Sequence, residues 1–140
     1  MAGRSFTFVS GAGSPLSGHL EPPEGTPRGW AIFAHCFTCG KDSRAAVHIS
    51  RALSRAGIGV LRFDFAGTGI GGGTGEPVNF ASDVEDLRAA ANAMAAAGMS
   101  PSLLVGHSLG GTAAIVAAAD MPDIAAVATI GAPADLQHIL

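Results

Sequence analysis

Four predominantly apolar runs, separated by segments of helical character, constrain the fold of this chain more than any other feature. The runs are WAIFAH (30–35), IGVLRFDF (58–65), SLLVG (102–106) and IAAVATIG (124–131). Such a run, without the strict alternation of a half-exposed strand, is typical of a parallel strand buried on both faces. Because strands that alternate with helices build parallel sheets covered on both sides, we predict an α/β fold: a three-layer α/β/α sandwich.

The segment from 42 to 57 predicts the first helix. Its apolar side chains recur at helical spacing on one face, which comprises Ile49, Ala52, Leu53 and Ala56. Ser50 and Ser54 fall elsewhere on the helix, and Gly57 ends it.

Two further helices are expected in the second half of the chain. SDVE (82–85) has the spacing of a capping box and predicts a helix start there. The helix that follows carries an apolar stripe of Val84, Leu87, Ala91 and Met94. SLGGTAAIVAAAD (108–120) is rich in alanine, and we expect this helix to be buried on several sides.

A hairpin precedes these units and completes the predicted sheet. SFTFVS (5–10) and LSGHLEPP (16–23) flank the turn residues GAGSP, which brings the mostly parallel sheet to about six strands. The chain has 140 residues, of which 48% are hydrophobic and 14% charged, so we expect one compact domain over residues 1–140.

The composition also excludes several function classes. The net charge is −3 and the lysines and arginines do not cluster, so we expect no nucleic-acid partner. The chain shows neither an apolar run long enough to span a bilayer nor a signal peptide, so we expect no membrane association and a cytoplasmic location. Two cysteines are too few for a disulfide framework.

GHSLGG (106–111) is the strongest chemical motif. It contains G-x-S-x-G, with the expected strand before it and the expected helix after it. At such a nucleophile elbow, small neighbours allow strand and helix to approach closely, and the serine hydroxyl stands at the top of the sheet. We predict that Ser108 is the nucleophile and that the N–H of Leu109 stabilises a developing oxyanion. An ordinary glycine-rich turn is the alternative.

AHCFTCGKD (34–42), after the first apolar run, has two functional interpretations. In the preferred one, the loop at Cys36 and Phe37 supplies the second oxyanion-hole donor, with the N–H of Phe37 favoured. In the other, Cys36 and Cys39 form a C-x-x-C redox pair at a helix start. Two buried thiols without a function are the third possibility. A zinc site lacks a second ligand cluster, so we expect no metal.

GTGIGG (67–72) matches the spacing of a dinucleotide fingerprint but lacks the helix that must open inside it. We interpret it as a turn that Asp64 fixes by accepting backbone hydrogen bonds, and we expect no cofactor. His19 is expected to be exposed, His48 is expected at the surface or at its boundary, and His107 is expected to shape the turn around Ser108.

The acid and base of a catalytic triad must follow Ser108 if the usual Ser–Asp–His order holds. Asp120 and Asp123 lie at the far end of the nucleophile helix, on the wrong side of the sheet. Asp135 and His138 follow the last apolar run at its carboxyl end, and their spacing places them on one side of a helical turn. We therefore predict His138 as the base and Asp135 as its partner.

Four stretches together resemble the α/β-hydrolase domain of bacterial hydrolases that are often fused to an OsmC-like redox domain: WAIFAHCFTCGKD, ISRALSRAGIGVLRFDFAGTG, LLVGHSLGGTAAIVAA and AAVATIGAPAD. The resemblance implies a nucleophile at Ser108 and an oxyanion hole formed by Leu109 with the loop at Cys36 and Phe37. That domain is longer, and the later strands that hold its acid and histidine have no counterpart here. The resemblance thus implies a truncated α/β-hydrolase fold.

These observations predict a serine hydrolase, specifically a carboxylesterase acting on small acyl esters. A catalytically incomplete binding module is the first alternative, and a thiol redox protein using Cys36 and Cys39 is the second. Because the last predicted strand has no neighbour on its outer side, its apolar edge invites pairing with another chain. We therefore expect a homodimer or a higher oligomer.

Overall fold

The computed structural model describes residues 3–35, 40–66 and 80–134. Within these ranges the chain forms strands and helices that alternate along most of its length. Their bounds are β1 Arg4–Val9, β2 Pro15–Glu21, β3 Gly29–Ala34, α1 Arg44–Arg55, β4 Ile58–Phe63, α2 Phe80–Ala96, β5 Leu103–His107, α3 Leu109–Ala118 and β6 Ala126–Ile130.

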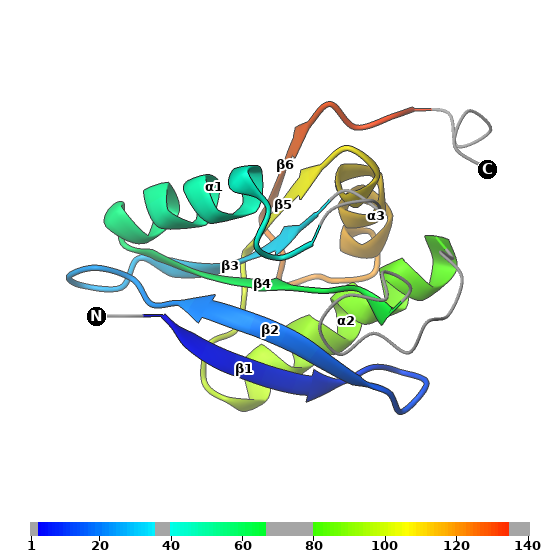
Figure 1. Cartoon of the computed structure of the whole chain (residues 1–140), viewed down its shortest axis with the longest axis horizontal. Coiled ribbons are helices and arrows are strands. Elements are labelled where there is room, and N and C mark those ends of the chain that lie inside the picture. The colour runs from blue at the N-terminus through cyan, green and yellow to red at the C-terminus, as the bar shows by residue number, and fades with distance from the viewer. Residues whose placement is uncertain (1–2, 36–39, 67–79, 135–140) are drawn as a thin grey trace.

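The strands form one six-stranded sheet in the order β1-β2-β4-β3-β5-β6 (Figure 1). β1 and β2 make the predicted hairpin, and β2 pairs antiparallel with β4. The pairs β4–β3, β3–β5 and β5–β6 are all parallel. The sheet is therefore mostly parallel, as predicted. The carboxyl ends of its parallel strands all lie at the same end of the sheet.

Helices cover both faces of this sheet. Ala46 of α1 packs in one core cluster with Phe33 and Val60 of the sheet. Leu87 of α2 and Ala114 of α3 belong to a larger cluster on the other face. Figure 1 shows α1 and α2 on opposite sides of the strands. The prediction of a three-layer α/β/α sandwich is thus confirmed, and the two clusters are its cores.

The first helix begins where predicted, but the face that it buries matches the predicted face only in part. The Ser43 side chain accepts a hydrogen bond from the Ala46 N–H at 3.3 Å and caps the helix start. Ser50 and Ser54 are buried against the sheet, whereas Ala52 is exposed. Of the four residues predicted to face the core, Ile49 and Leu53 pack against it and Ala52 and Ala56 do not, so the predicted apolar face was right in part. Ser54 is satisfied there, because its hydroxyl donates to the Pro22 carbonyl at 2.6 Å.

The second helix begins before the proposed capping box. It starts at Phe80, so Ser82 lies inside its first turn and the predicted helix start was wrong. The predicted apolar stripe is confirmed, since its four members are all buried: Val84, Leu87, Ala91 and Met94.

The third helix and the last strand are more exposed than their composition indicated. On α3, Ile115 is 53% exposed and Val116 43%, so one side of this helix faces solvent, whereas the sides toward the sheet and α2 are buried as predicted. β6 lies at the edge of the sheet, and Ile130 is 45% exposed. Apolar composition alone does not show whether a neighbouring element is present to cover a surface. Among the described residues, no helix is both long and apolar enough to cross a membrane.

Candidate active site

The turn between β5 and α3 has an unusual backbone at Ser108. This residue has φ 56° and ψ −125°, and it alone among the described non-glycine residues has a positive φ. Its N–H donates to the Ile130 carbonyl at 2.8 Å, which fixes the turn to the end of β6. Because a side chain in this backbone region is strained, the surrounding structure must hold it there. We call this strand–turn–helix unit, residues 106–111, the Ser108 turn.

Two glycines, Gly106 and Gly110, permit the close packing of this turn. A Cβ at Gly106 would lie 2.3 Å from the Cα of Gly111, so strand and helix could not approach as they do. A Cβ at Gly110 would lie 2.3 Å from the carbonyl oxygens of both Ala34 and His35. The first turn of α3 therefore packs directly against the carboxyl end of β3.

By the general rule for helix starts, the N–H of Leu109 has no partner inside α3, whereas the N–H of Gly111 donates to the Ser108 carbonyl at 2.9 Å. Leu109 is the first residue of α3 and is 3% exposed, while Ser108 is half-buried. Within the described part of the chain, the Ser108 side chain does not cap the helix. The turn thus places a hydroxyl beside the positive end of a helix dipole, which suits a developing negative charge.

The chain that leaves β6 passes beside the same turn. The Thr112 hydroxyl of α3 donates to the Pro133 carbonyl at 2.7 Å. A Cβ at Gly111 would meet the Cβ of Ala132 at 2.9 Å. Asp135 and His138, which come next, lie outside the described residues, as do Cys36, Phe37 and Cys39.

A buried carboxylate, missed as a site residue by the sequence analysis, fastens the connection between β3 and α1. Asp64, 1% exposed, accepts the Lys41 N–H at 2.8 Å and the Lys41 ammonium at 3.2 Å. Asp64 was expected to fix the glycine-rich turn after β4. That turn lies outside the described residues, so this expectation stays a prediction; among the described residues, Asp64 holds the chain that follows residues 36–39. Burial lowers the pKa of Lys41, but Asp42 and Asp64 outweigh this effect and raise it above its usual value.

Charged side chains continue from this point across the α1 side of the sheet. Arg62, 4% exposed, donates to Glu21 at 3.1 Å and lies 3.7 Å from Asp42. Burial opposes the ionised form of Glu21, but Arg62 outweighs it and holds the pKa of Glu21 below its usual range. His19 is half-buried rather than exposed, since its Nε2 lies 3.2 Å from Glu21. His48 is exposed, as predicted.

Two buried carboxyl groups on α2 also went unnoticed in the sequence. Asp86 accepts the Ala66 N–H at 3.0 Å and so holds the end of the segment after β4. Burial, followed by the nearby charge of Asp86, raises the pKa of Asp83 from 3.8 to about 7. Their spacing of three residues was the available signal, because it places both on one helical face.

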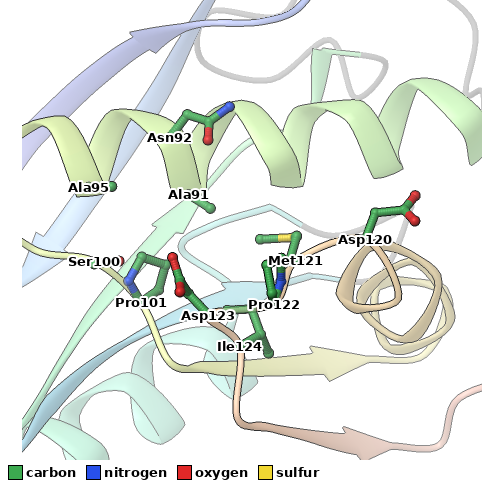
Figure 2. A pocket seen from close by; sticks show the side chains of 10 residues that line it. All are labelled: Ala91, Asn92, Ala95, Ser100, Pro101, Asp120, Met121, Pro122, Asp123 and Ile124. Atoms are coloured by element: carbon green, nitrogen blue, oxygen red, sulfur yellow. The ribbon is translucent and has the colours of Figure 1, made fainter.

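A pocket of about 150 Å³ lies at the other end of the sheet (Figure 2). Ser100 and Pro101, which precede β5, line it together with the connection from α3 to β6. Asp120 and Asp123 also line it, which confirms that they lie away from Ser108. In residues 3–35, 40–66 and 80–134, no group of three or more His, Cys, Asp or Glu side chains could hold a metal ion.

Comparison with known families identifies the class of protein. The profile of the family described as serine aminopeptidase, S33, matches residues 25–139. The chain therefore belongs to this α/β-hydrolase family. A search of curated proteins finds no match. The association with an OsmC-like domain stays a prediction.

Solved structures of α/β hydrolases share the fold. The chain is 45% identical to the esterase domain of a Rhodothermus marinus protein, with a TM-score of 0.80, covering 99% of this chain and 54% of that one. It is 26% identical to a serine hydrolase without a lid from Xanthomonas campestris, with a TM-score of 0.84, covering 96% of this chain and 63% of that one. The chain thus spans about half to two thirds of the length of these two structures.

Proposed function

We propose that this protein is a serine hydrolase and that the Ser108 turn is its nucleophile elbow. The observation that carries the proposal is the strained backbone of Ser108, with φ 56° and ψ −125°, between a parallel strand and a helix. Strain of this kind persists where function requires a particular presentation of the side chain. Ser108 is half-buried and lies at the carboxyl end of β5, the end of the sheet at which ligands of such folds bind.

The chemistry follows from the groups around this hydroxyl. The Ser108 Oγ attacks the carbonyl carbon of an ester, and its proton passes to a base. The N–H of Leu109 donates to the oxyanion of the tetrahedral intermediate, and the second donor comes from the loop at Cys36 and Phe37. Collapse of the intermediate releases the alcohol, to which the base returns the proton, and water then hydrolyses the acyl-enzyme.

We propose His138 as the base and Asp135 as the group that orients it. The route of the chain supports this assignment, because the Thr112–Pro133 hydrogen bond holds the preceding residues beside α3. Ser108, Asp135 and His138 also keep the usual chain order of the fold family.

The proposed substrate class is small acyl esters. The description of the Rhodothermus marinus relative as an esterase domain supports a carboxylic ester over an amide. An ester also has a better leaving group than an amide, so it makes smaller demands on the general acid.

Hydrolysis of p-nitrophenyl acetate tests this function. We would compare the wild type with Ser108→Ala, His138→Ala and Cys36→Ser, using Ser102→Ala as the matched serine control. Ser102 is exposed and precedes β5, at the opposite end of that strand from Ser108. The proposal predicts turnover in the wild type and in Ser102→Ala, and its loss in both Ser108→Ala and His138→Ala.

The other outcomes distinguish the alternatives. Loss in Ser108→Ala alone would mean that a group other than His138 is the base. Turnover that survives in Ser108→Ala and is lost in Cys36→Ser would favour thiol chemistry. A wild type without turnover would favour a binding module.

A further inference from the structure

The chain that leaves β6 closes over the Ser108 turn through two hydrogen bonds, one on each side of a tight bend. Before the bend, the Ile130 carbonyl accepts the Ser108 N–H at 2.8 Å. Gly131 then turns the chain with φ 61°, a conformation that favours glycine. After the bend, the Pro133 carbonyl accepts the Thr112 hydroxyl at 2.7 Å. We call residues 130–133 the β6 bend.

The β6 bend also packs directly against the first turn of α3. A Cβ at Gly111 would lie 2.9 Å from the Cβ of Ala132, which stands between the two hydrogen bonds. The same Cβ would lie 3.1 Å from the Cβ of Thr129, the residue before the bend. A shift of the bend therefore changes the packing of the Ser108 turn itself.

The Ser108–Ile130 hydrogen bond lies at the end of the ladder between β5 and β6. The register of these two strands ends with His107 opposite Ile130. β6 is an edge strand of the described sheet, so β5 is its one strand neighbour there. Bonds at the end of such a ladder open more readily than those inside it. Because the positive φ of Ser108 persists only where the surroundings hold it, this bond needs support from outside the ladder.

Thr112, one residue beyond the Ser108 turn on α3, makes a contact that supports the bond. A threonine inside a helix can donate to the carbonyl four residues earlier, which here is that of Ser108. That carbonyl accepts the Gly111 N–H at 2.9 Å, and the Thr112 hydroxyl donates its one proton to Pro133. The half-buried Thr112 hydroxyl thus joins α3 to the far side of the β6 bend.

We propose that Thr112 is a positioning residue, whose hydroxyl holds the β6 bend over the Ser108 turn and so preserves the strained backbone of Ser108. The proposal rests on the proposed function, in which Ser108 attacks the ester. Thr112 touches neither substrate nor reacting atoms in this role. It acts through the Ser108–Ile130 bond on the placement of the nucleophile, so its loss lowers kcat and leaves KM nearly unchanged.

Two substitutions separate the hydroxyl of Thr112 from the shape of its side chain. Thr112→Val replaces the hydroxyl by a methyl group of similar size, whereas Thr112→Ser keeps the hydroxyl and removes the methyl group. Thr7→Val is the matched control, because it makes the same chemical change at an exposed position of β1, on the opposite edge of the sheet.

The experiment measures amide exchange at Ser108 by NMR and hydrolysis of p-nitrophenyl acetate on the same proteins. One neutral hydrogen bond changes an opening equilibrium about fivefold, so we expect the Ser108 amide to exchange about fivefold faster in Thr112→Val. Misplacement of a catalytic group by about 1 Å costs about 100-fold in rate; for a smaller displacement we expect kcat to fall about tenfold with KM nearly unchanged. Thr112→Ser should restore both quantities, and Thr7→Val should change neither.

Each other result overturns a defined part of the proposal. Unchanged exchange at Ser108 in Thr112→Val would overturn it even if kcat falls, because the hydroxyl would then act elsewhere than on the turn. Faster exchange with unaltered kcat, or a rise in KM alone, would remove the positioning role.

The remaining outcomes concern the side chain and the function. A loss that Thr112→Ser does not restore would assign the effect to the methyl group and overturn the role of the hydroxyl. If Thr112→Val does not fold, Thr112→Ala takes its place in the same comparisons. A wild type without turnover would overturn the proposed function, and exchange at Ser108 alone would then decide whether Thr112 holds the turn.

Discussion

Replacement of Gly110 by alanine is the sharpest perturbation of the packing around the Ser108 turn. The new Cβ would lie 2.3 Å from two backbone carbonyl oxygens, those of Ala34 and His35, whereas ordinary van der Waals contact begins near 3.4 Å. Both atoms belong to the main chain, so neither can move aside by a change of rotamer. The helix must therefore shift away from β3 by about 1 Å.

The expected change in the free energy of unfolding of Gly110→Ala is a balance of two effects. Gly110 lies in the first turn of α3, where alanine is favoured over glycine by up to about 1 kcal/mol. Overpacking of a rigid site costs about 1–3 kcal/mol, and two immovable contacts place this site at the upper end. We expect a net loss of about 2 kcal/mol, which lowers the Tm of a domain of this size by about 6–10 °C.

Thermal and urea unfolding followed by circular dichroism measure this loss. Gly11→Ala is the matched control, because no atom of residues 3–35, 40–66 and 80–134 lies within 4 Å of its added Cβ. That variant should be neutral or slightly stabilised, by up to about 1 kcal/mol. A Gly110→Ala protein as stable as the wild type would refute the argument that α3 and β3 are in direct backbone contact there.

Three further predictions concern strain, titration and assembly. Ser108→Gly removes the energetic penalty of a side chain at φ 56°. We therefore expect the free energy of unfolding in urea to rise by about 1 kcal/mol and ester turnover to be lost. A destabilised variant would argue against backbone strain at this position. Asp83, whose pKa burial and the charge of Asp86 raise to about 7, binds its proton more tightly when folded, so stability should fall as the pH rises from about 4 to about 7. Asp83→Asn should flatten this slope and add at most about 4 kcal/mol above pH 7, and an unaltered pH profile of unfolding would contradict the assignment. We propose that the exposed edge of β6 mediates self-association. Ala128→Lys on β6 should then reduce the mass found by light scattering at micromolar concentration, whereas Val9→Lys on β1, at the opposite edge, should not. A monomeric wild type would exclude this self-association.

The sheet and its layers could be predicted from the sequence because strands that are buried on both faces have predominantly apolar sequences. The runs at β3, β4 and β5 are apolar because helices cover them on both sides. Gly106 and Gly110 could be predicted equally well, since each is required by a close approach of the backbone that a side chain would block. Local pattern and tertiary packing agree at these positions.

Helix faces were predicted less well, because small residues do not reveal which side is covered. Ser50 and Ser54 of α1 are buried, and the Ser54 hydroxyl donates to the Pro22 carbonyl. Ala52 on the same helix is exposed although alanine is apolar. On α3, the sides toward the sheet and α2 are buried, but Ile115 on the remaining side is exposed although it is apolar. Whether another element packs against a helix face depends on the tertiary structure, which the periodicity of the sequence does not reveal.

The polar contacts around the site were the least predictable part. The Asp64–Lys41 pair joins residues 23 positions apart, and the Arg62–Glu21 pair joins residues 41 apart. No local spacing marks either pair, since the topology of the sheet alone brings them together. The Asp83–Asp86 pair differs, because its helical spacing was visible and was not used.

Covalent labelling of Ser108 tests the central claim most directly. The wild type would be treated with a fluorophosphonate, and the adduct would be located by intact mass and peptide mapping, with Ser108→Ala and Ser102→Ala treated in parallel. The account predicts one adduct, on Ser108, which is lost in Ser108→Ala and kept in Ser102→Ala. A wild type that stays unlabelled, or an adduct that persists in Ser108→Ala, would contradict it.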